Sequence, residues 1–95
     1  MKQPKMLVAA NDHVVINFEE FDSKLWSDAV KHLEIHLGFS RCGERVAGLD
    51  EGILPSFVNG KVSIEAGWDN WSGNYLLSTC GAGDKVLSNL FMRFS

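Results

Sequence analysis

Apolar side chains recur at helical spacing over residues 23–37 and form one narrow stripe on a helical wheel. The members of the stripe are Trp26, Ala29, Val30, Leu33 and Leu37. Asp22 or Ser23 can accept hydrogen bonds from the first free amides of such a helix. Gly38 is the residue type that ends many helices in a left-handed conformation. The pattern therefore predicts a helix over residues 23–37.

A second helical pattern closes the chain. Its apolar face comprises Val86, Leu87, Leu90, Phe91 and Phe94. The preceding Gly81-Ala82-Gly83 run predicts the end of a strand, and Asp84 stands where it can cap the helix. This run lacks the spacing of a phosphate-binding glycine loop, and a carboxylate at a helix start repels an anion. We therefore interpret it as a turn followed by a cap.

Elsewhere apolar and polar residues alternate with the period of two that is typical of half-buried strands. The alternation covers residues 14–18 and 62–66. We also predict strands over residues 6–9, 53–58 and 75–80, and a weak one over residues 41–46. Asn59-Gly60 is a strong hairpin signal, because both residue types tolerate a positive φ.

These elements give the order β-β-α-β-β-β-α. A chain of 95 residues is long enough for one domain and too short for two, so we expect a single domain over residues 1–95. Each amphipathic helix needs an apolar surface to cover, and the strands offer one. The sequence therefore predicts an α+β, two-layer sandwich, with two helices on one face of a mostly antiparallel sheet of about five strands.

Composition narrows the function classes. Hydrophobic residues make up 45% of the chain and charged residues 22%, as in globular rather than disordered proteins. The net charge is −3, so neither nucleic acid nor an anionic membrane is an expected partner. No apolar run reaches the roughly 20 residues of a membrane-spanning helix. The apolar stretch near the N-terminus is too short for a secretory signal, so we expect a cytoplasmic protein.

Two cysteines, Cys42 and Cys80, lie far apart in the sequence. Small secreted domains usually carry four or more cysteines, and a metal-binding pair usually has a short spacing. We therefore predict that both are reduced thiols, buried as small apolar residues. A Cys42–Cys80 disulfide stays open as an alternative if the two strands that carry them are neighbours.

The densest group of unusual residues lies between positions 68 and 75. Trp68, Trp71 and Tyr75 stand within this short segment, interleaved with Asp69 and Asn70. Aromatic rings beside carboxylate and amide groups are typical of contact surfaces, because the rings stack while the polar groups orient the partner. A hairpin connection whose tryptophans close over the core explains the same pattern. We take these five residues as the candidate binding residues.

Asp28, His32 and His36 recur every four residues along the first predicted helix, a spacing that occurs in helical metal sites. On the wheel His36 lies beside the apolar stripe, whereas His32 and Asp28 turn progressively toward solvent. Three diverging side chains do not converge on one ion. We therefore expect no metal and no other cofactor, and we find no sequence pattern of a catalytic site.

The helix start Phe21-Asp22-x-x-x-Trp26 and the segment Trp68-Asp69-x-Trp71-x-Gly73-x-Tyr75 occur within this element order. In architecture the chain resembles small uncharacterised bacterial proteins carried on mobile gene cassettes, and some immunity-type proteins that bind a toxin partner. The resemblance implies a non-enzymatic binding role in a bacterium. It transfers no catalytic residue.

Two functional hypotheses follow. In the first, the chain is a non-enzymatic cytoplasmic binding or interaction protein with a contact surface centred on Trp68–Tyr75. Its partner is then another protein or a second copy in a homodimer. In the alternative, the chain is a small-ligand-binding domain or an enzyme with a pocket between helices and sheet, lined by Trp26, Trp68, Trp71 and His36.

Overall fold

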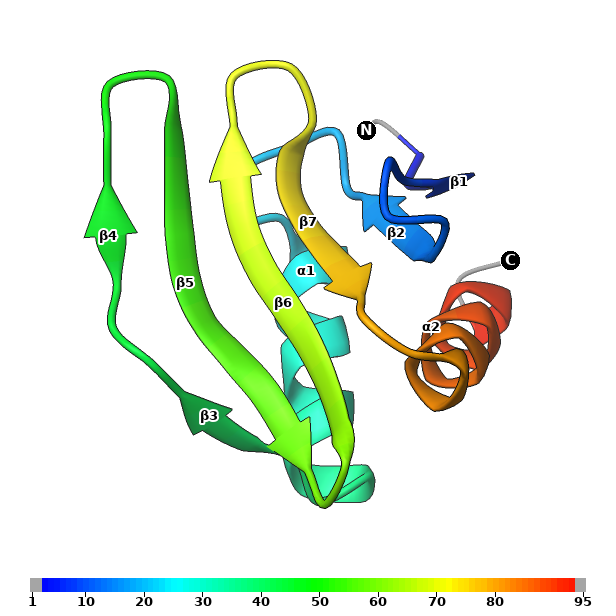
Figure 1. The fold of residues 1–95 in the computed structure, drawn as a ribbon. Helices are drawn as coiled ribbons and strands as arrows, with labels where there is room; N and C mark the ends of the chain where they lie inside the picture. Colours follow the sequence, from blue (N-terminus) through cyan, green and yellow to red (C-terminus); the bar gives the residue numbers. More distant parts are fainter. Residues whose placement is uncertain (1–2, 94–95) are drawn as a thin grey trace.

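Seven strands form one antiparallel sheet in the computed structural model, which describes residues 3–93 (Figure 1). The strands are β1 (Lys5–Val8), β2 (Val14–Asn17), β3 (Ser40–Cys42), β4 (Val46–Ala47), β5 (Glu51–Asn59), β6 (Val62–Asp69) and β7 (Gly73–Ser78). Their spatial order is β1-β2-β7-β6-β5-β3, and β4 also pairs with β5. The helices are α1 (Lys24–Lys31), which continues into the π-helical turn η1 (His32–His36), and α2 (Gly81–Arg93).

The predicted sheet of about five strands in the order β-β-α-β-β-β-α is wrong. The weakly patterned residues 41–46 overlap two short strands, β3 and β4, which pair in turn with β5 on either side of Gly43. These strands have three and two residues and are held mainly by backbone pairing, so they produce little alternation in the sequence. The α+β class and the antiparallel pairing are confirmed.

One core joins both helices to the sheet. Alternate residues of β2, β6 and β7 point toward the helices, and α1 passes behind the sheet in Figure 1. The core residues are Ile16, Phe18, Trp26, Ala29, Leu33, Phe39, Phe57, Ile64, Ala66, Leu76, Leu87 and Leu90. We call the sheet face that carries this core the inner face and the opposite face the outer face.

The first predicted helix is present, but its last part is a π-helical turn. Ser23, rather than Asp22, caps α1, because the Ser23 Oγ accepts a hydrogen bond from the Trp26 amide at 3.1 Å. η1 covers His32–His36. The Phe39 amide donates to the Leu33 carbonyl at 2.9 Å, which brings the chain back onto the core after the helix.

The start of α2 differs from the prediction. The helix begins at Gly81, and the Gly83 amide donates to the Sγ of Cys80 at 3.4 Å, so Asp84 lies inside the first turn instead of capping it. Phe94 of the predicted apolar face lies outside the described residues. Both thiols are free, but Cys42 is exposed and Cys80 is only partly buried, so the prediction of two buried cysteines is wrong.

The connection between β6 and β7 is shorter than the sequence suggested, because the two strands extend to Asp69 and from Gly73. The chain before α1 runs beside this hairpin. The Glu19 amide donates to the Ser72 carbonyl at 2.7 Å, and the Asn74 amide donates to the Glu20 carbonyl at 3.0 Å. Among the described residues, no helix is long and apolar enough to cross a membrane.

Replacing Gly73 by alanine should destabilise the fold more than the same change at Gly60. Both glycines have a positive φ, of 68° and 60°, so alanine at either position should cost about 1–2 kcal/mol. A Cβ at Gly60 meets nothing within 4 Å, whereas a Cβ at Gly73 would overlap backbone atoms of Glu20. Urea unfolding should show at least about 1 kcal/mol of additional loss for Gly73→Ala. Equal losses would contradict the close approach at Gly73.

Candidate functional site

The aromatic residues of the 68–75 segment point in three directions. Trp68 shares the side of β6 that carries the buried Ile64 and Ala66, so it lies on the inner face. Tyr75 lies on the outer face, because its neighbour Leu76 is buried in the core. Trp71 stands in the turn between the strands and is 79% exposed. The segment therefore contributes to separate surfaces.

Hydrogen bonds hold the turn that carries Trp71. The Asp69 Oδ1 accepts from the amides of Trp71 and Ser72 at 2.9 and 2.5 Å. Such a side-chain turn fixes the backbone on either side of the exposed indole. Asp69, one of the predicted binding residues, thus stabilises the turn. Asn70, another of them, joins this turn to a neighbouring one.

A second hairpin tip lies next to this one. The Asn70 amide donates to the Asp50 carbonyl at 3.0 Å, and the Asn70 Nδ2 donates to the Asp50 Oδ1 at 2.8 Å. Leu49, in the turn between β4 and β5, is 97% exposed. Figure 1 shows both turns at the same end of the sheet. Leu49 and Trp71 are therefore two large, exposed hydrophobic residues on adjacent turns.

Apolar side chains continue from these tips onto the outer face. Tyr75, Gly67, Ile53 and Val46 are consecutive partners across four strands. A Cβ at Gly67 would meet the Tyr75 hydroxyl, so the phenol lies across Gly67 toward β5. A cavity of about 300 Å³ lies between Tyr75 and the β4–β5 hairpin.

We use the name tip surface for the residues exposed at the two turns together with this outer-face row: Leu49, Trp71, Val46, Ile53 and Tyr75.

The tip surface carries negative charge. Burial raises the pKa of Tyr75, and the carboxylates of Glu65, Asp69 and Glu51 raise it further. Residues 46–60 and 62–84 contain no lysine or arginine. The hydrophobic side chains of the tips are thus surrounded by acids without nearby bases from the same hairpins.

Leu49, Val46 and Ile53 were not among the predicted binding residues. One signal for them is visible in the sequence: Leu49 stands in the turn-like run Gly48-Leu49-Asp50, where a fully apolar side chain has no core to enter. Val46 and Ile53 carry no such signal, because their exposure depends on which face of β5 meets the helices.

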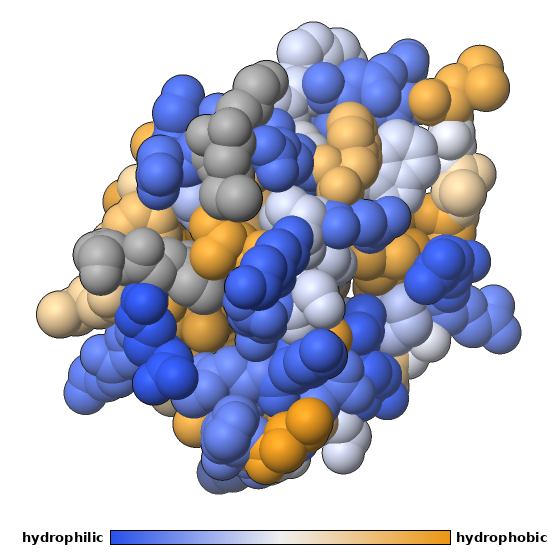
Figure 2. Space-filling model, turned by 180° about the vertical axis from the view of Figure 1, so that it is seen from behind, coloured by the Kyte–Doolittle hydropathy of each residue, from blue (hydrophilic) through white to orange (hydrophobic). Residues whose placement is uncertain are grey.

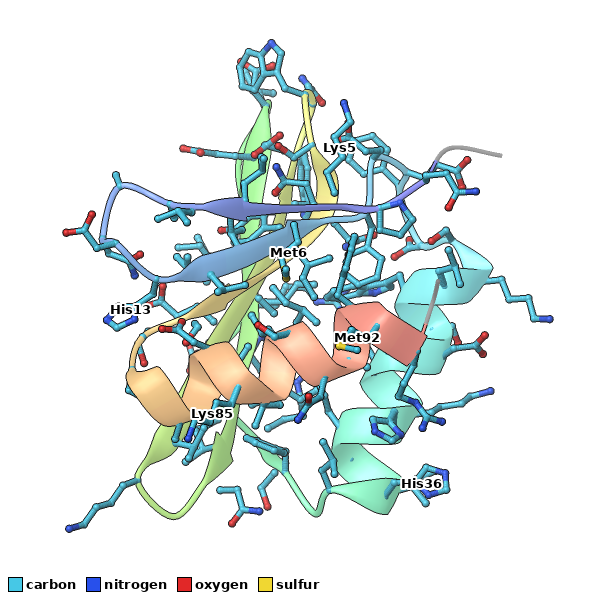
Figure 3. All side chains as sticks on the ribbon, turned by 90° about the vertical axis from the view of Figure 1, so that its right-hand side faces the viewer. Lys5, Met6, His13, His36, Lys85 and Met92 are labelled. Carbon is cyan, nitrogen blue, oxygen red and sulfur yellow. The ribbon has the colours of Figure 1, made fainter. Side chains whose placement is uncertain are left out.

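The residues of the alternative pocket separate in a similar way. Trp26 and Trp68 do line one cavity, of about 270 Å³, on the inner face beside α1. Trp71 lies at the hairpin tip, and Figure 3 shows His36 at the opposite end of the helix from the start of α1. The structure therefore places Trp26 and Trp68 in one cavity on the inner face, whereas Trp71 and His36 do not line this cavity.

The helical triad does not form a three-ligand metal site. The ring centroids of His32 and His36 are 5.3 Å apart, but Asp28 does not join them, and the described residues contain no group of three metal-ligating side chains. Burial lowers the pKa of His32, and the nearby Arg93 and His36 lower it further. A cationic neighbour such as Arg93 also opposes a bound cation.

A different histidine, His13, forms a polar contact between two elements that are far apart in the sequence. His13 lies in the turn between β1 and β2, beside the first turn of α2 (Figure 3). Its Nδ1 is 2.9 Å from the Asp84 Oδ2, and the Val14 amide donates to the Asp84 Oδ1 at 2.9 Å. These hydrogen bonds, with that of His13 the larger contribution, lower the pKa of Asp84 to about 2. The pair ties the N-terminal hairpin to α2.

Comparisons with family models, with curated proteins and with solved structures each gave no match. We therefore infer the function from the geometry of the chain itself.

The Asp84 contacts should make stability depend on pH. Asp84 has a pKa of about 2 instead of the ordinary 3.8, so its contribution is fully present above about pH 4 and is lost as the pH falls through 2. We expect Asp84→Asn to lower the melting temperature at pH 6. The gap from the unsubstituted protein should narrow between pH 4 and pH 2. Asp28→Asn is the control, since the Asp28 side chain makes no hydrogen bond or ion pair with the described residues. A gap that stays constant down to pH 2 would contradict the role of this carboxylate.

Proposed function

We propose that the chain is a protein-interaction domain that binds a partner segment of apolar and basic residues through the tip surface. The observation that carries the proposal is the ordered exposure of Leu49 and Trp71 on two hairpin turns joined by hydrogen bonds. A large aromatic side chain held in place is the kind of residue that contributes most to protein–protein binding. Holding it in a fixed turn lowers the entropy lost on binding.

The chemistry of the partner follows from the charges around the tips. Asp50, Glu51 and Asp69 flank the exposed hydrophobic residues, and no basic residue of either hairpin neutralises them. Lysine or arginine side chains on the partner would be attracted to this rim, while apolar side chains would cover Leu49 and Trp71. The cavity beside Tyr75 is large enough to accept one such side chain.

The same charges disfavour a homodimer through the tips. Two copies in tip-to-tip contact would bring their acidic rims together, and like charges at short range repel. A different protein with the opposite charge avoids this cost. We therefore favour a heterologous partner over self-association at this surface.

The opposite side of the molecule offers a weaker contact surface. Seen from behind the sheet, hydrophobic side chains lie in small patches separated by polar ones (Figure 2). Ile35, for example, is 73% exposed on η1, but scattered exposed aliphatic residues are common on monomeric proteins. The tips differ because two large, exposed hydrophobic residues stand on turns that hydrogen bonds join to each other.

The test is a peptide selection. A library of random peptides displayed on phage is selected on the unsubstituted protein, and peptides that also bind Trp71→Ala are removed. We expect the remaining peptides to be rich in lysine, arginine and large apolar residues. Fluorescence anisotropy should show at least about tenfold weaker binding to Trp71→Ala, as expected for a central aromatic contact. Binding should also weaken as salt is raised.

Ile35→Ala is the matched control, because it removes a comparably exposed hydrophobic side chain from a different part of the surface. It should leave peptide binding unchanged. Both variants should keep the unfolding free energy within about 0.5 kcal/mol of the unsubstituted protein. Selection of acidic peptides, or equal binding to Trp71→Ala, would refute the proposal.

A further inference from the structure

A second recessed region lies on the inner face, on the other side of the sheet from the outer-face part of the tip surface. It is the cavity of about 270 Å³ between α1, the middle of the sheet and residues 41–47. Its apolar lining comes from Trp26, Val30, Leu54 and Trp68, and its cations are Arg41 and Arg45. A neighbouring hollow of about 360 Å³ shares Asp22, Trp26 and Val30 with it. We call the cavity the aromatic cleft.

Packing fixes both tryptophans that line the cleft. The Trp26 ring meets Phe18 edge to face, with centroids 5.2 Å apart. The Trp68 ring meets Phe21 in the same manner at 5.9 Å. Trp68 also lies over Gly52, where a Cβ would overlap the indole. The cleft is therefore preformed, and little conformational entropy of its aromatic side chains would be lost when a ligand binds.

The two arginines of the cleft differ in how they are used. Arg41 is committed to the fold: its Nε and Nη2 donate to the Pro55 carbonyl at 3.1 and 2.9 Å. Its guanidinium lies 4.1 Å from the ring centroid of Phe57, and Glu34 is 3.9 Å from its Nη1. The Pro55 carbonyl is available because the β5–β6 register shifts between Leu54 and Phe57. Arg41 therefore has little capacity left for a ligand.

Arg45 is not used in this way. It forms no hydrogen bond or ion pair with any part of the chain that the structure describes, although it lines the same cleft as Arg41. Burial lowers the pKa of Arg41, Glu34 opposes this shift, and the nearby positive charge of Arg45 lowers the pKa further. Arg45 is exposed and lines the cavity, and a guanidinium without a partner among the described residues is suited to an anionic group.

We propose that the aromatic cleft binds a small planar ligand with one anionic group, whose ring contacts Trp26 and Trp68 and whose anion pairs with Arg45. Carboxylates and phosphate monoesters of an aromatic ring share this chemistry. Asp22 also lines the cavity, so a ligand that carries a hydrogen-bond donor would meet an acidic residue there. This site is independent of the partner-binding role of the tip surface.

Tryptophan fluorescence provides the test. The chain has three tryptophans, so in a Trp71→Phe background both remaining indoles line the cleft. Phenyl phosphate and benzoate are each titrated into this protein. Two controls are titrated in the same way: benzyl alcohol, which has the ring without the anion, and inorganic phosphate, which has the anion without the ring. We expect saturable quenching by at least one aromatic anion, with a dissociation constant below about 1 mM. Whichever anion binds more tightly identifies the headgroup class.

Substitution of the unpartnered cation gives the second arm. Arg45→Ala should weaken binding of the aromatic anion by about tenfold or more, as expected for the loss of a charge-assisted hydrogen bond. Lys61→Ala, which removes one positive charge at the β5–β6 turn, should leave it unchanged. Equal binding to Arg45→Ala, equal binding of benzyl alcohol, or no saturable response to either anion would overturn the proposal.

Discussion

Two pairs of residues, each an aromatic side chain opposite a glycine on the neighbouring strand, shape the middle of the sheet. Trp68 is the partner of Gly52, and Tyr75 is the partner of Gly67. In both pairs a Cβ on the glycine would overlap the ring or its hydroxyl, so the ring lies over bare backbone. The aromatic side chain thereby supplies the packing that glycine lacks within a strand. Because successive residues point to opposite faces, one ring covers the inner face and the other covers the outer face.

This arrangement explains why both recessed regions occur where they do. The Trp68 indole forms part of the aromatic cleft, and the Tyr75 phenol forms one side of the outer-face cavity. Gly52 contributes to both recessed regions. Trp68 covers it on the inner face, and Gly52 also lines the outer-face cavity. A single layer of backbone therefore separates the two regions. Substitution of that glycine would disturb both, whereas Trp71 and Arg45 each affect only one of them.

Much of the fold is readable from the sequence because the signals are local. The stripe from Trp26 to Leu33 requires a helix, and alternation around Ile64 requires a strand with one buried face. The short strands β3 and β4 are different, because they owe their position to pairing with β5 and to the Arg41 contact with the Pro55 carbonyl. The β3 pairs and the Arg41 contact join residues 14 or more positions apart, so no local pattern shows them. β4 pairs with nearby residues, but its two residues are too few to show an alternating pattern.

The same distinction applies to the candidate sites. The sequence identified the aromatic segment from residue types alone, but it treated Trp68, Trp71 and Tyr75 as one surface. Their separation depends on where β6 ends and β7 begins, and a strand that continues to Asp69 assigns Trp68 and Tyr75 to opposite faces. The sequence also could not show that the turn with Leu49 lies next to the turn with Trp71, because the contact between Asn70 and Asp50 joins the two turns only in the folded chain.

The net charge of the chain does not describe the charge of each part of its surface. The value of −3 argues against binding a long polyanion, which requires a broad basic surface. In this fold, however, three acids lie around the hairpin tips, while Arg41 and Arg45 lie at the cleft. The outer-face cavity and the cleft open on opposite faces of the sheet, so a molecule bound at one meets different charged residues from a molecule bound at the other. A molecule that is acidic overall can therefore attract a basic partner at one surface and a small anion at another.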